Sequence, residues 1–229
     1  MLDGTSRERR EDRHVLVEGG HIREISDRPI KSAIAETIDL AGGILMPGLI
    51  DAHVHVLAVD APLARLSDRP VTLLTLQAAK ALERMLQRGF TTIRDAGGGA
   101  DGGLAEAVEG GLVRGPRIFP SGMALSQTGG HGDVRPRTQS VVACACCERG
   151  IALSRIADGV AECRRAARDE LRKGATQTKI LASGGVASPH DPIWNLQYSE
   201  EEVRAIVEEA QAWHTYVMGM PIRPRRSAA

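Results

Sequence analysis

Apolar and polar residues alternate twice near the start of the chain. Residues 14–18 (HVLVE) and 21–25 (HIREI) each follow a two-residue period, and Gly19 and Gly20 separate them. A period of two places the apolar side chains on one face of a strand, and a glycine pair supplies a tight turn. The pattern predicts a β hairpin, followed by a second short strand unit around residues 37–40.

From residue 48 onward the pattern changes to strands that alternate with helices. Residues 49–56 form an apolar run typical of a buried strand, and residues 71–87 repeat their apolar positions with a helical period. The glycine-rich segment 122–150 is long for a structureless connection. This alternation implies a parallel sheet with right-handed crossovers. The other expected elements are strands 91–94, 117–120, 177–182 and 215–218 and helices 104–113, 155–172 and 199–213.

Composition and charge narrow the class of protein. The 229 residues are 42% hydrophobic and 25% charged, with 29 basic and 29 acidic side chains. This balance is typical of a globular protein, excludes disorder and collagen-like repeats, and offers no basic footprint for nucleic acid or anionic lipid. The sequence contains neither a long apolar run nor a secretory signal. We therefore expect a cytoplasmic protein without nucleic-acid or membrane partners.

Three of the four cysteines cluster at Cys144, Cys146 and Cys147. Structural zinc sites usually use paired C-x₂₋₄-C spacings, and adjacent cysteines cannot easily reach one ion. We interpret the cluster as reduced thiols in a surface loop. A cysteine-based metal sensor is the alternative, and it predicts metal loss when these residues are mutated.

Side chains with chemical potential stand at the ends of the expected strands. In a parallel α/β barrel these carboxyl-terminal ends form the catalytic face. His53 and His55 end the first strand, Asp95 ends the second, and Lys179 lies within the fourth. His131 follows the third strand in a Gly-Gly-His-Gly loop, where glycine permits close approach of the backbone to a ligand.

His53 and His55 lie two residues apart on a strand, so both imidazoles point to the same face and can bind one cation. Alone, such a pair is a weak signal, because ordinary core and surface histidines also occur two apart. The context strengthens it. Met46, Pro47 and Gly48 lead directly into the buried strand that carries the pair.

Three segments resemble the amidohydrolase superfamily. Residues 46–55 (MPGLIDAHVH) match its P-G-x-I-D-x-H-x-H motif at the first barrel strand. Residues 178–189 (TKILASGGVASP) resemble the fourth strand of the imidazolonepropionase-like branch, which includes prolidase-type dipeptidases, and residues 127–133 (QTGGHGD) are similar to its substrate loop. The resemblance covers nearly the whole chain up to about residue 218.

The resemblance implies a fold class and a domain organisation. We expect an α/β fold that is the N-terminal part of a (β/α)8 TIM-like barrel, preceded by a small, incomplete β-sandwich domain. Residues 1–47 would be the sandwich portion. Residues 48–218 would be the first half of the hydrolase barrel, strands 1 to 5.

The resemblance also implies a metal site. It makes His53 and His55 ligands of the more buried metal, with Lys179 carboxylated by carbon dioxide so that its carbamate bridges two divalent ions, expected to be Zn²⁺. An uncharged amine can react with carbon dioxide to give two anionic oxygens, and a buried lysine on an apolar strand is otherwise costly. The alternative is an ion pair between Lys179 and a carboxylate.

Three further residues are candidates for substrate contact. The resemblance implies such contact for His131 in the glycine-rich loop. Asp95 could line the same face, although an aspartate before Ala-Gly-Gly is equally typical of a turn. His190 lies in the loop after the lysine strand and could approach the site, although it is also explained as an ordinary loop residue.

The function implied is hydrolysis of C–N bonds by a metal-dependent enzyme. The expected substrate is a small-molecule amide, namely a dipeptide, an N-acyl amino acid or a related compound, with a cyclic amide such as an imidazolone as the alternative. Full-length relatives are expected to be homo-oligomeric. The histidines of strands 5 and 6 and the aspartate of strand 8 have no counterpart, so no catalytic residue is assigned. The alternative function is therefore a catalytically incomplete fragment without activity of its own.

The end of the chain departs from the family branch. Residues 219–224 read GMPIRP where the branch tends to read Gly-His-Ala-Tyr-Thr-Pro. Loss of one cytosine from a reconstructed codon sequence converts the second reading into the first. We therefore expect residues 219–229 to be a frameshifted tail on a truncated chain. Resequencing of the gene across these codons tests the expectation.

Overall fold

The structure is a computed structural model, and it describes residues 1–59, 66, 68–98, 101–135, 137–138, 152–186 and 191–219. The chain divides into two compact units, Met1–Gly48 and Leu49–Ala229. The cysteine cluster at 144–147, His190 and tail residues 220–229 lie outside the described residues.

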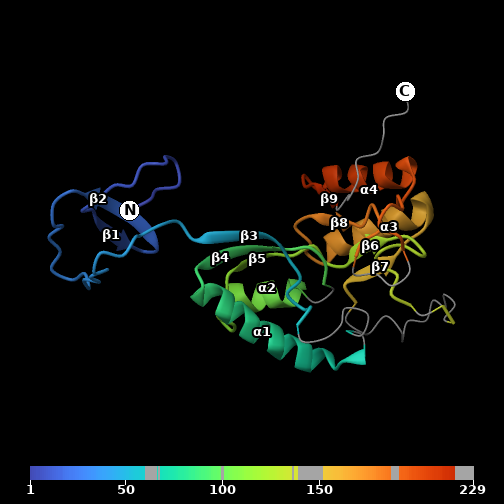
Figure 1. Ribbon diagram of the computed structural model, residues 1–229, viewed down its shortest axis with the longest axis horizontal. Coiled ribbons are helices and arrows are strands. Elements are labelled where there is room, and N and C mark those ends of the chain that lie inside the picture. The colour runs from blue at the N-terminus through green and yellow to red at the C-terminus, as the bar shows by residue number, and fades with distance from the viewer. Residues whose placement is uncertain are drawn as a thin grey trace. The chain divides into compact units, whose positions relative to one another are not determined.

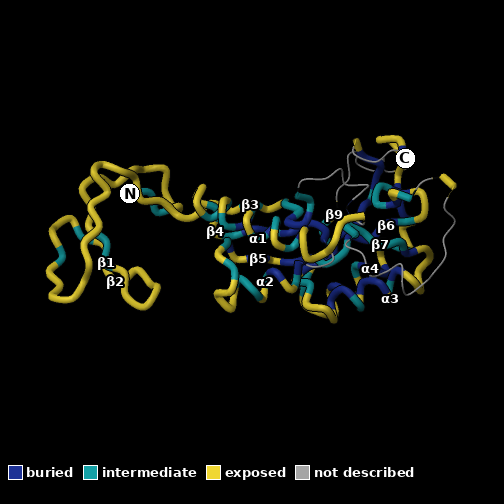
Figure 2. The backbone as a smooth tube through the Cα atoms, turned by 90° about the horizontal axis from the view of Figure 1, so that it is seen from below, coloured by how far each residue is buried: buried dark blue, intermediate teal, exposed yellow. Residues whose placement is uncertain are grey.

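The N-terminal unit contains the predicted hairpin. β1 (His14–Glu18) and β2 (His21–Ser26) pair antiparallel. Gly19 and Gly20 form the turn with φ angles of 58° and 79°, a region that favours glycine. Figure 2 shows this unit as mostly exposed. The strand predicted at 37–40 is wrong: its backbone is irregular, and the apolar side chains there are exposed rather than packed on a partner strand.

The second unit begins with three parallel strands and two helices. β3 (Leu49–Val54), β4 (Phe90–Asp95) and β5 (Arg117–Phe119) form the first sheet in that order. α1 (Val71–Gln87) and α2 (Asp101–Glu109) run along it (Figure 1). Leu74 and Leu82 of α1 are buried in one cluster with Ile93 of β4. Each such side chain contributes about 1.5–3 kcal/mol when it leaves water. The predicted helix 71–87 is confirmed.

Four more parallel strands form the second sheet. They are β6 (Ala124–Ser126), β7 (Ser154–Ile156), β8 (Thr178–Ile180) and β9 (Val217–Gly219), in the order β7-β6-β8-β9. α3 (Gly159–Arg172) and α4 (Glu200–Ala212) pack on this sheet around Ile180 and Ile206. The capping box predicted at the start of α4 is confirmed: Ser199 Oγ accepts from Glu202 N, and the Glu202 carboxylate accepts from Ser199 N.

Local structure departs from the sequence prediction in three places. Residues 154–156 are a strand that pairs with β6, so helix α3 begins at Gly159 rather than at residue 155. β6 lies inside the segment predicted to be a loop. It is a strand because it pairs with β7 and β8 in the second sheet. α2 spans 101–109 rather than 104–113, and it ends where Gly110 and Gly111 follow.

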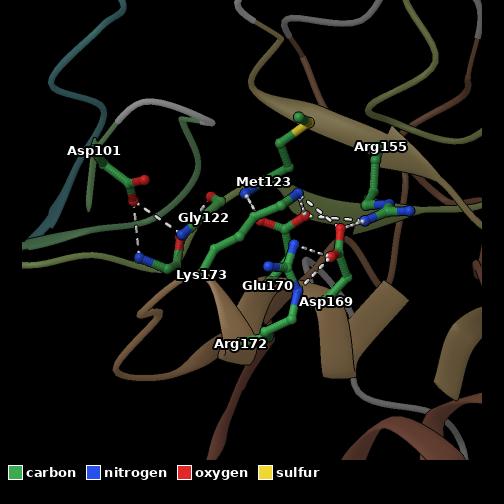
Figure 3. A network of polar contacts seen from close by, with 9 residues as sticks. Asp101, Gly122, Met123, Arg155, Asp169, Glu170, Arg172 and Lys173 are labelled. Atoms are coloured by element: carbon green, nitrogen blue, oxygen red, sulfur yellow. Dashed lines mark hydrogen bonds and ion pairs between the residues drawn. The ribbon is translucent and has the colours of Figure 1, made fainter. Parts of the chain in front are cut away.

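Two buried carboxylates hold the chain where it passes from the first sheet to the second (Figure 3). Asp101 Oδ2 accepts hydrogen bonds from Ser121 N and Gly122 N, both at 2.9 Å. Glu170 Oε2 accepts from Met123 N at 3.1 Å. A Cβ atom on Gly122, whose φ is +66°, would lie 2.3 Å from Glu170 Oε2. Only glycine therefore fits this joint without displacing the carboxylate.

Hydrogen bonds also connect the entry to β8 with the first sheet. Thr176 N donates to Pro120 O at 2.8 Å, and Gln177 Nε2 donates to Phe119 O and Asp95 O, both at 3.2 Å. The carboxyl ends of β4 and β5 are thus connected to the amino end of β8. None of the described helices is long and apolar enough to cross a membrane.

Candidate metal centre

The two histidines of the H-x-H pair meet at the end of β3. His53 lies within the strand and His55 follows it, and their ring centroids are 5.4 Å apart with an interplanar angle of 69°. His55 Nδ1 lies 3.0 Å from Gly97 O. A carbonyl oxygen can only accept, so Nδ1 carries the proton and the lone pair of Nε2 is free. This is the tautomer that a metal-binding histidine needs.

The surroundings of both imidazoles favour their neutral form. Partial desolvation, followed by the positive charge of Lys179, lowers the pKa of His53, although this residue is exposed. Burial also lowers the pKa of His55, against the hydrogen bond to Gly97, which favours the charged ring. Neutral imidazole is the form that binds a cation. The Lys179 ammonium disfavours a positive charge on both rings.

Lys179 lies in the middle of β8 with 1% of its surface exposed. Its Nζ atom is buried and has no hydrogen-bond partner among the residues that the structure describes. Burial lowers the pKa of Lys179 to about 8. The ion pair with a carboxylate, which was the alternative interpretation, is not formed within the described part of the chain. A buried amine without a partner is costly unless a further group completes its surroundings.

Asp95, at the end of β4, holds the backbone on both sides of the His55 hydrogen bond. The side chain is fully buried, its Oδ2 accepts from Val56 N and its Oδ1 accepts from Gly97 N, both at 2.8 Å. Burial and the neighbouring Asp101 raise the pKa of Asp95 to about 8, against the two N–H donors. Asp95 therefore fixes Val56, which follows His55, and Gly97, whose carbonyl oxygen accepts the hydrogen bond from His55. Both oxygens of Asp95 accept from backbone N–H groups. The substrate contact suggested by the sequence stays a prediction.

His131 lies in the loop after β6, where several hydrogen bonds fix the path of the chain. Its backbone N–H donates to Gln197 Oε1 at 2.9 Å, and its Nδ1 lies 3.5 Å from Asp191 Oδ2. The ring packs against Gly185, in the segment that follows β8. The loop of His131 and the strand of Lys179 are thereby joined.

Sequence reasoning did not find Asp191 and Gln197. Both are buried polar residues in the segment between β8 and α4. Asp191 directly follows the predicted candidate His190, which lies outside the described residues. Their polar character in a segment that follows the lysine strand was the available signal. Their contacts with His131 depend on the fold and have no sequence signature.

Comparison with known proteins identifies the family. Residues 44–219 match the Amidohydrolase family. The chain is 39% identical over 189 residues to ochratoxinase from Aspergillus niger, an alignment that covers 73% of this chain and 37% of that protein. It therefore spans well under half the length of this relative.

Solved structures share the fold. A prolidase crystallised with N-methylphosphonate-L-proline has a TM-score of 0.85 at 56% identity, and the match covers 90% of this chain and 50% of that one. A Xaa-Pro dipeptidase with bound methionine has a TM-score of 0.76 at 29% identity, with the same coverage of 90% and 50%. These matches confirm the predicted α/β fold with parallel sheets, the N-terminal part of a TIM-like barrel. On this evidence the chain belongs to the amidohydrolase family.

Proposed function

We propose that the protein is a metal-dependent hydrolase that cleaves the amide bond of a dipeptide or an N-acyl amino acid. The observation that carries this proposal is the buried Lys179 Nζ, which has no hydrogen-bond partner among the described residues, together with the paired imidazoles of His53 and His55. Membership of the amidohydrolase family supports cleavage of a C–N bond.

The residues present fit a divalent metal ion. His53 and His55 supply two neutral imidazole nitrogens, and Lys179 supplies anionic oxygens once its free amine has taken up carbon dioxide. The described residues contain no group of three or more His, Cys, Asp or Glu side chains placed to hold a metal, so Lys179 has to complete the set. Such an ion, proposed to be Zn²⁺, supplies the Lewis acidity that polarises an amide carbonyl and makes water a stronger nucleophile.

The relatives suggest the class of substrate. A prolidase at 56% identity was crystallised with N-methylphosphonate-L-proline, and a phosphonate has the tetrahedral shape that an amide carbonyl adopts during hydrolysis. A dipeptidase and ochratoxinase are also among the similar proteins. We therefore propose a substrate with an acyl group on the nitrogen of an L-amino acid. A cyclic amide such as an imidazolone is the alternative substrate.

Each described residue of the site has one role in this proposal. His53 and His55 orient the metal, and Asp95 holds His55 through Val56 N and Gly97. His131 contacts the substrate from the loop after β6 and orients the scissile amide. These roles consist of binding and orientation, and no described side chain is assigned as the general base.

A second candidate is a non-catalytic chain that binds at most one metal ion. It is favoured by the limited ligand set, two histidines and one lysine among the described residues. The number of bound ions separates the two candidates. The hydrolase requires close to two ions per chain, whereas the binding protein holds one or none.

The direct test is hydrolysis by the full chain after incubation with Zn²⁺ and bicarbonate. Release of the free amino acid is measured for a panel of Xaa-Pro dipeptides, N-acetyl-L-amino acids and an imidazolone, together with the metal content. The expected result is turnover of at least one acylated amino acid and its loss in Lys179→Met. Two bound ions without turnover of any compound would contradict the proposal, and one ion or none without turnover would favour the second candidate.

A further inference from the structure

The loop that carries His131 is fixed from several sides. Gly132 N donates to Ser126 Oγ at 3.0 Å, and Ser154 Oγ donates to Gly132 O at 2.7 Å. Gly129 N donates to Asp133 Oδ2 at 2.8 Å. A Cβ atom on Gly132 would lie 2.5 Å from Ser154 Oγ, so the glycine allows this close approach. The backbone on both sides of His131 is therefore held in one conformation.

A buried carboxylate faces the ring of His131. The Asp191 side chain has 0% of its surface exposed, and its Oδ2 accepts from Gln197 Nε2 at 3.0 Å and from Gly185 N at 3.2 Å. The same oxygen lies 3.5 Å from His131 Nδ1. This distance is that of an ion pair and is long for a hydrogen bond, but such contacts often shorten when a ligand binds.

Gln197 links the backbone and the ring of His131 to this carboxylate. Its Oε1 accepts from His131 N at 2.9 Å while its Nε2 donates to Asp191. The two ends of one amide thus bind the histidine backbone and the group that faces its ring. Because an N–H can only donate and a carboxylate can only accept, this arrangement also fixes which end of the amide is oxygen.

The two nitrogens of the His131 ring have different surroundings. Nδ1 is buried and has no hydrogen-bond partner within the described residues, so Asp191 Oδ2 is the acceptor available to it. The side chain as a whole keeps 13% of its surface exposed. At the Cε1 edge of the ring, a Cβ on Gly185 would lie 2.2 Å from Cε1, 2.6 Å from Nε2 and 2.7 Å from Nδ1. Only the bare backbone of glycine lets the ring lie here.

We infer that Asp191 is a positioning residue that keeps the proton of neutral His131 on Nδ1 and so presents the Nε2 lone pair to the substrate. Gln197 orients the Asp191 carboxylate by donating a hydrogen bond to its Oδ2. The inference rests on the proposed function only for the identity of the ligand that meets Nε2. The preference of one tautomer is a property of the chain alone.

The test is the tautomer of His131, read from long-range ¹H–¹⁵N correlations of the ¹⁵N-labelled full chain. The pH is raised until the ring signals no longer change, so that the neutral ring is observed. His131→Gln identifies the signals among the seven histidines. We expect the Nδ1–H form to exceed the Nε2–H form by about tenfold in the wild type, as a charge-assisted contact implies. In Asp191→Asn the two forms should approach equal populations.

Asp158→Asn is the matched control. Asp158 precedes α3 and accepts from Thr128 N at 2.9 Å and Thr128 Oγ1 at 2.7 Å, so this variant removes a carboxylate that holds the same loop without contacting the ring. It should keep the wild-type tautomer. An Nε2–H form that predominates in the wild type would overturn the inference even if Asp191→Asn does not fold, and so would an unchanged tautomer in folded Asp191→Asn.

A ligand titration separates this inference from the proposed function. N-acetyl-L-proline is added to the zinc-loaded wild type while the His131 ring nitrogens are monitored. A shift confined to Nε2 supports both proposals. If the spectrum does not change, the proposed substrate class fails, while the tautomer populations still decide the role of Asp191.

Discussion

Two histidines of this chain are held by buried aspartates in different ways. At the end of the first sheet, His55 donates from Nδ1 to the backbone carbonyl of Gly97, and Asp95 holds Gly97 through its N–H. In the loop after β6, His131 faces the carboxylate of Asp191 directly. Asp95 acts on the first ring through the backbone of Gly97, whereas Asp191 faces the second ring directly.

The difference matches two kinds of chemistry. A carbonyl partner fixes the tautomer but adds no negative charge, which suits a neutral ligand of a metal ion. A carboxylate partner fixes the tautomer and can also stabilise a second proton on the ring, which suits contact with a polar substrate. The two regions therefore use the same residue types for separate tasks, and mutations should separate their effects.

The largest separation is expected when the rings themselves are removed. His55→Ala should weaken Zn²⁺ binding by about 100-fold or more, because it deletes a ligand, whereas His131→Ala should change it by less than about threefold. Isothermal titration of the two variants measures the contrast. Equal losses in both would show that His131 is a ligand and would remove the distinction between the regions.

The next effect concerns the aspartates. Asp95→Asn should weaken Zn²⁺ binding by about tenfold, because loss of a group that orients a ligand typically costs 10–100-fold. Asp191→Asn should leave Zn²⁺ affinity unchanged while it alters the tautomer of His131. Competition with a chromogenic chelator measures both affinities. A larger effect from Asp191→Asn than from Asp95→Asn would reverse the assignment.

A smaller effect is expected from the glycine beneath the second ring. Gly185→Ala should destabilise the fold by about 1–3 kcal/mol, because its Cβ would overlap the His131 ring and force it to move. Gly103→Ala is the control, since a Cβ there meets nothing within 4 Å. Urea unfolding gives both values. Equal stability of Gly185→Ala and wild type would mean that the ring is not confined there.

The smallest effect is the pH dependence that Asp101, beside the first sheet, gives to the free energy of unfolding. Burial raises the folded-state pKa of Asp101 to about 6 from 3.8, so the folded chain binds more protons than the unfolded chain between these values. Stability from this group is full below the unfolded pKa and is lost as the pH rises through the folded pKa. From pH 5 to pH 7 the loss should be about 1 kcal/mol. Urea unfolding of wild type and Asp101→Asn measures it, and an identical pH dependence would contradict the assignment.

Elements that are determined by short stretches of sequence could be predicted, whereas elements that depend on pairing between distant segments could not. Helix α1 and the hairpin were predicted with nearly correct bounds, because their periodicity and their glycine turn are local signals. The strand at 154–156 was missed, because it exists only through pairing with β6. The predicted strand at 37–40 shows the reverse, an alternating sequence without a strand.

The candidate site divides in the same way. His53, His55 and Lys179 could be singled out because motif spacing and strand position are visible in the sequence. The supporting contacts could not, because Asp191 lies 60 residues from His131 along the chain and their contact depends on how the loops after β6 and β8 pack. The burial of Asp95 beneath His55 likewise depends on the pairing of β3 and β4.

The central claim is that His53, His55 and Lys179 together hold a divalent metal ion. The most direct measurement is a crystal structure of the chain grown with Zn²⁺ and bicarbonate, with the metal located by anomalous scattering. We predict a zinc ion about 2.0–2.1 Å from a nitrogen of each histidine and bound to a carbamate oxygen on Lys179. Zinc bound elsewhere on the chain, with Lys179 unmodified, would contradict the claim.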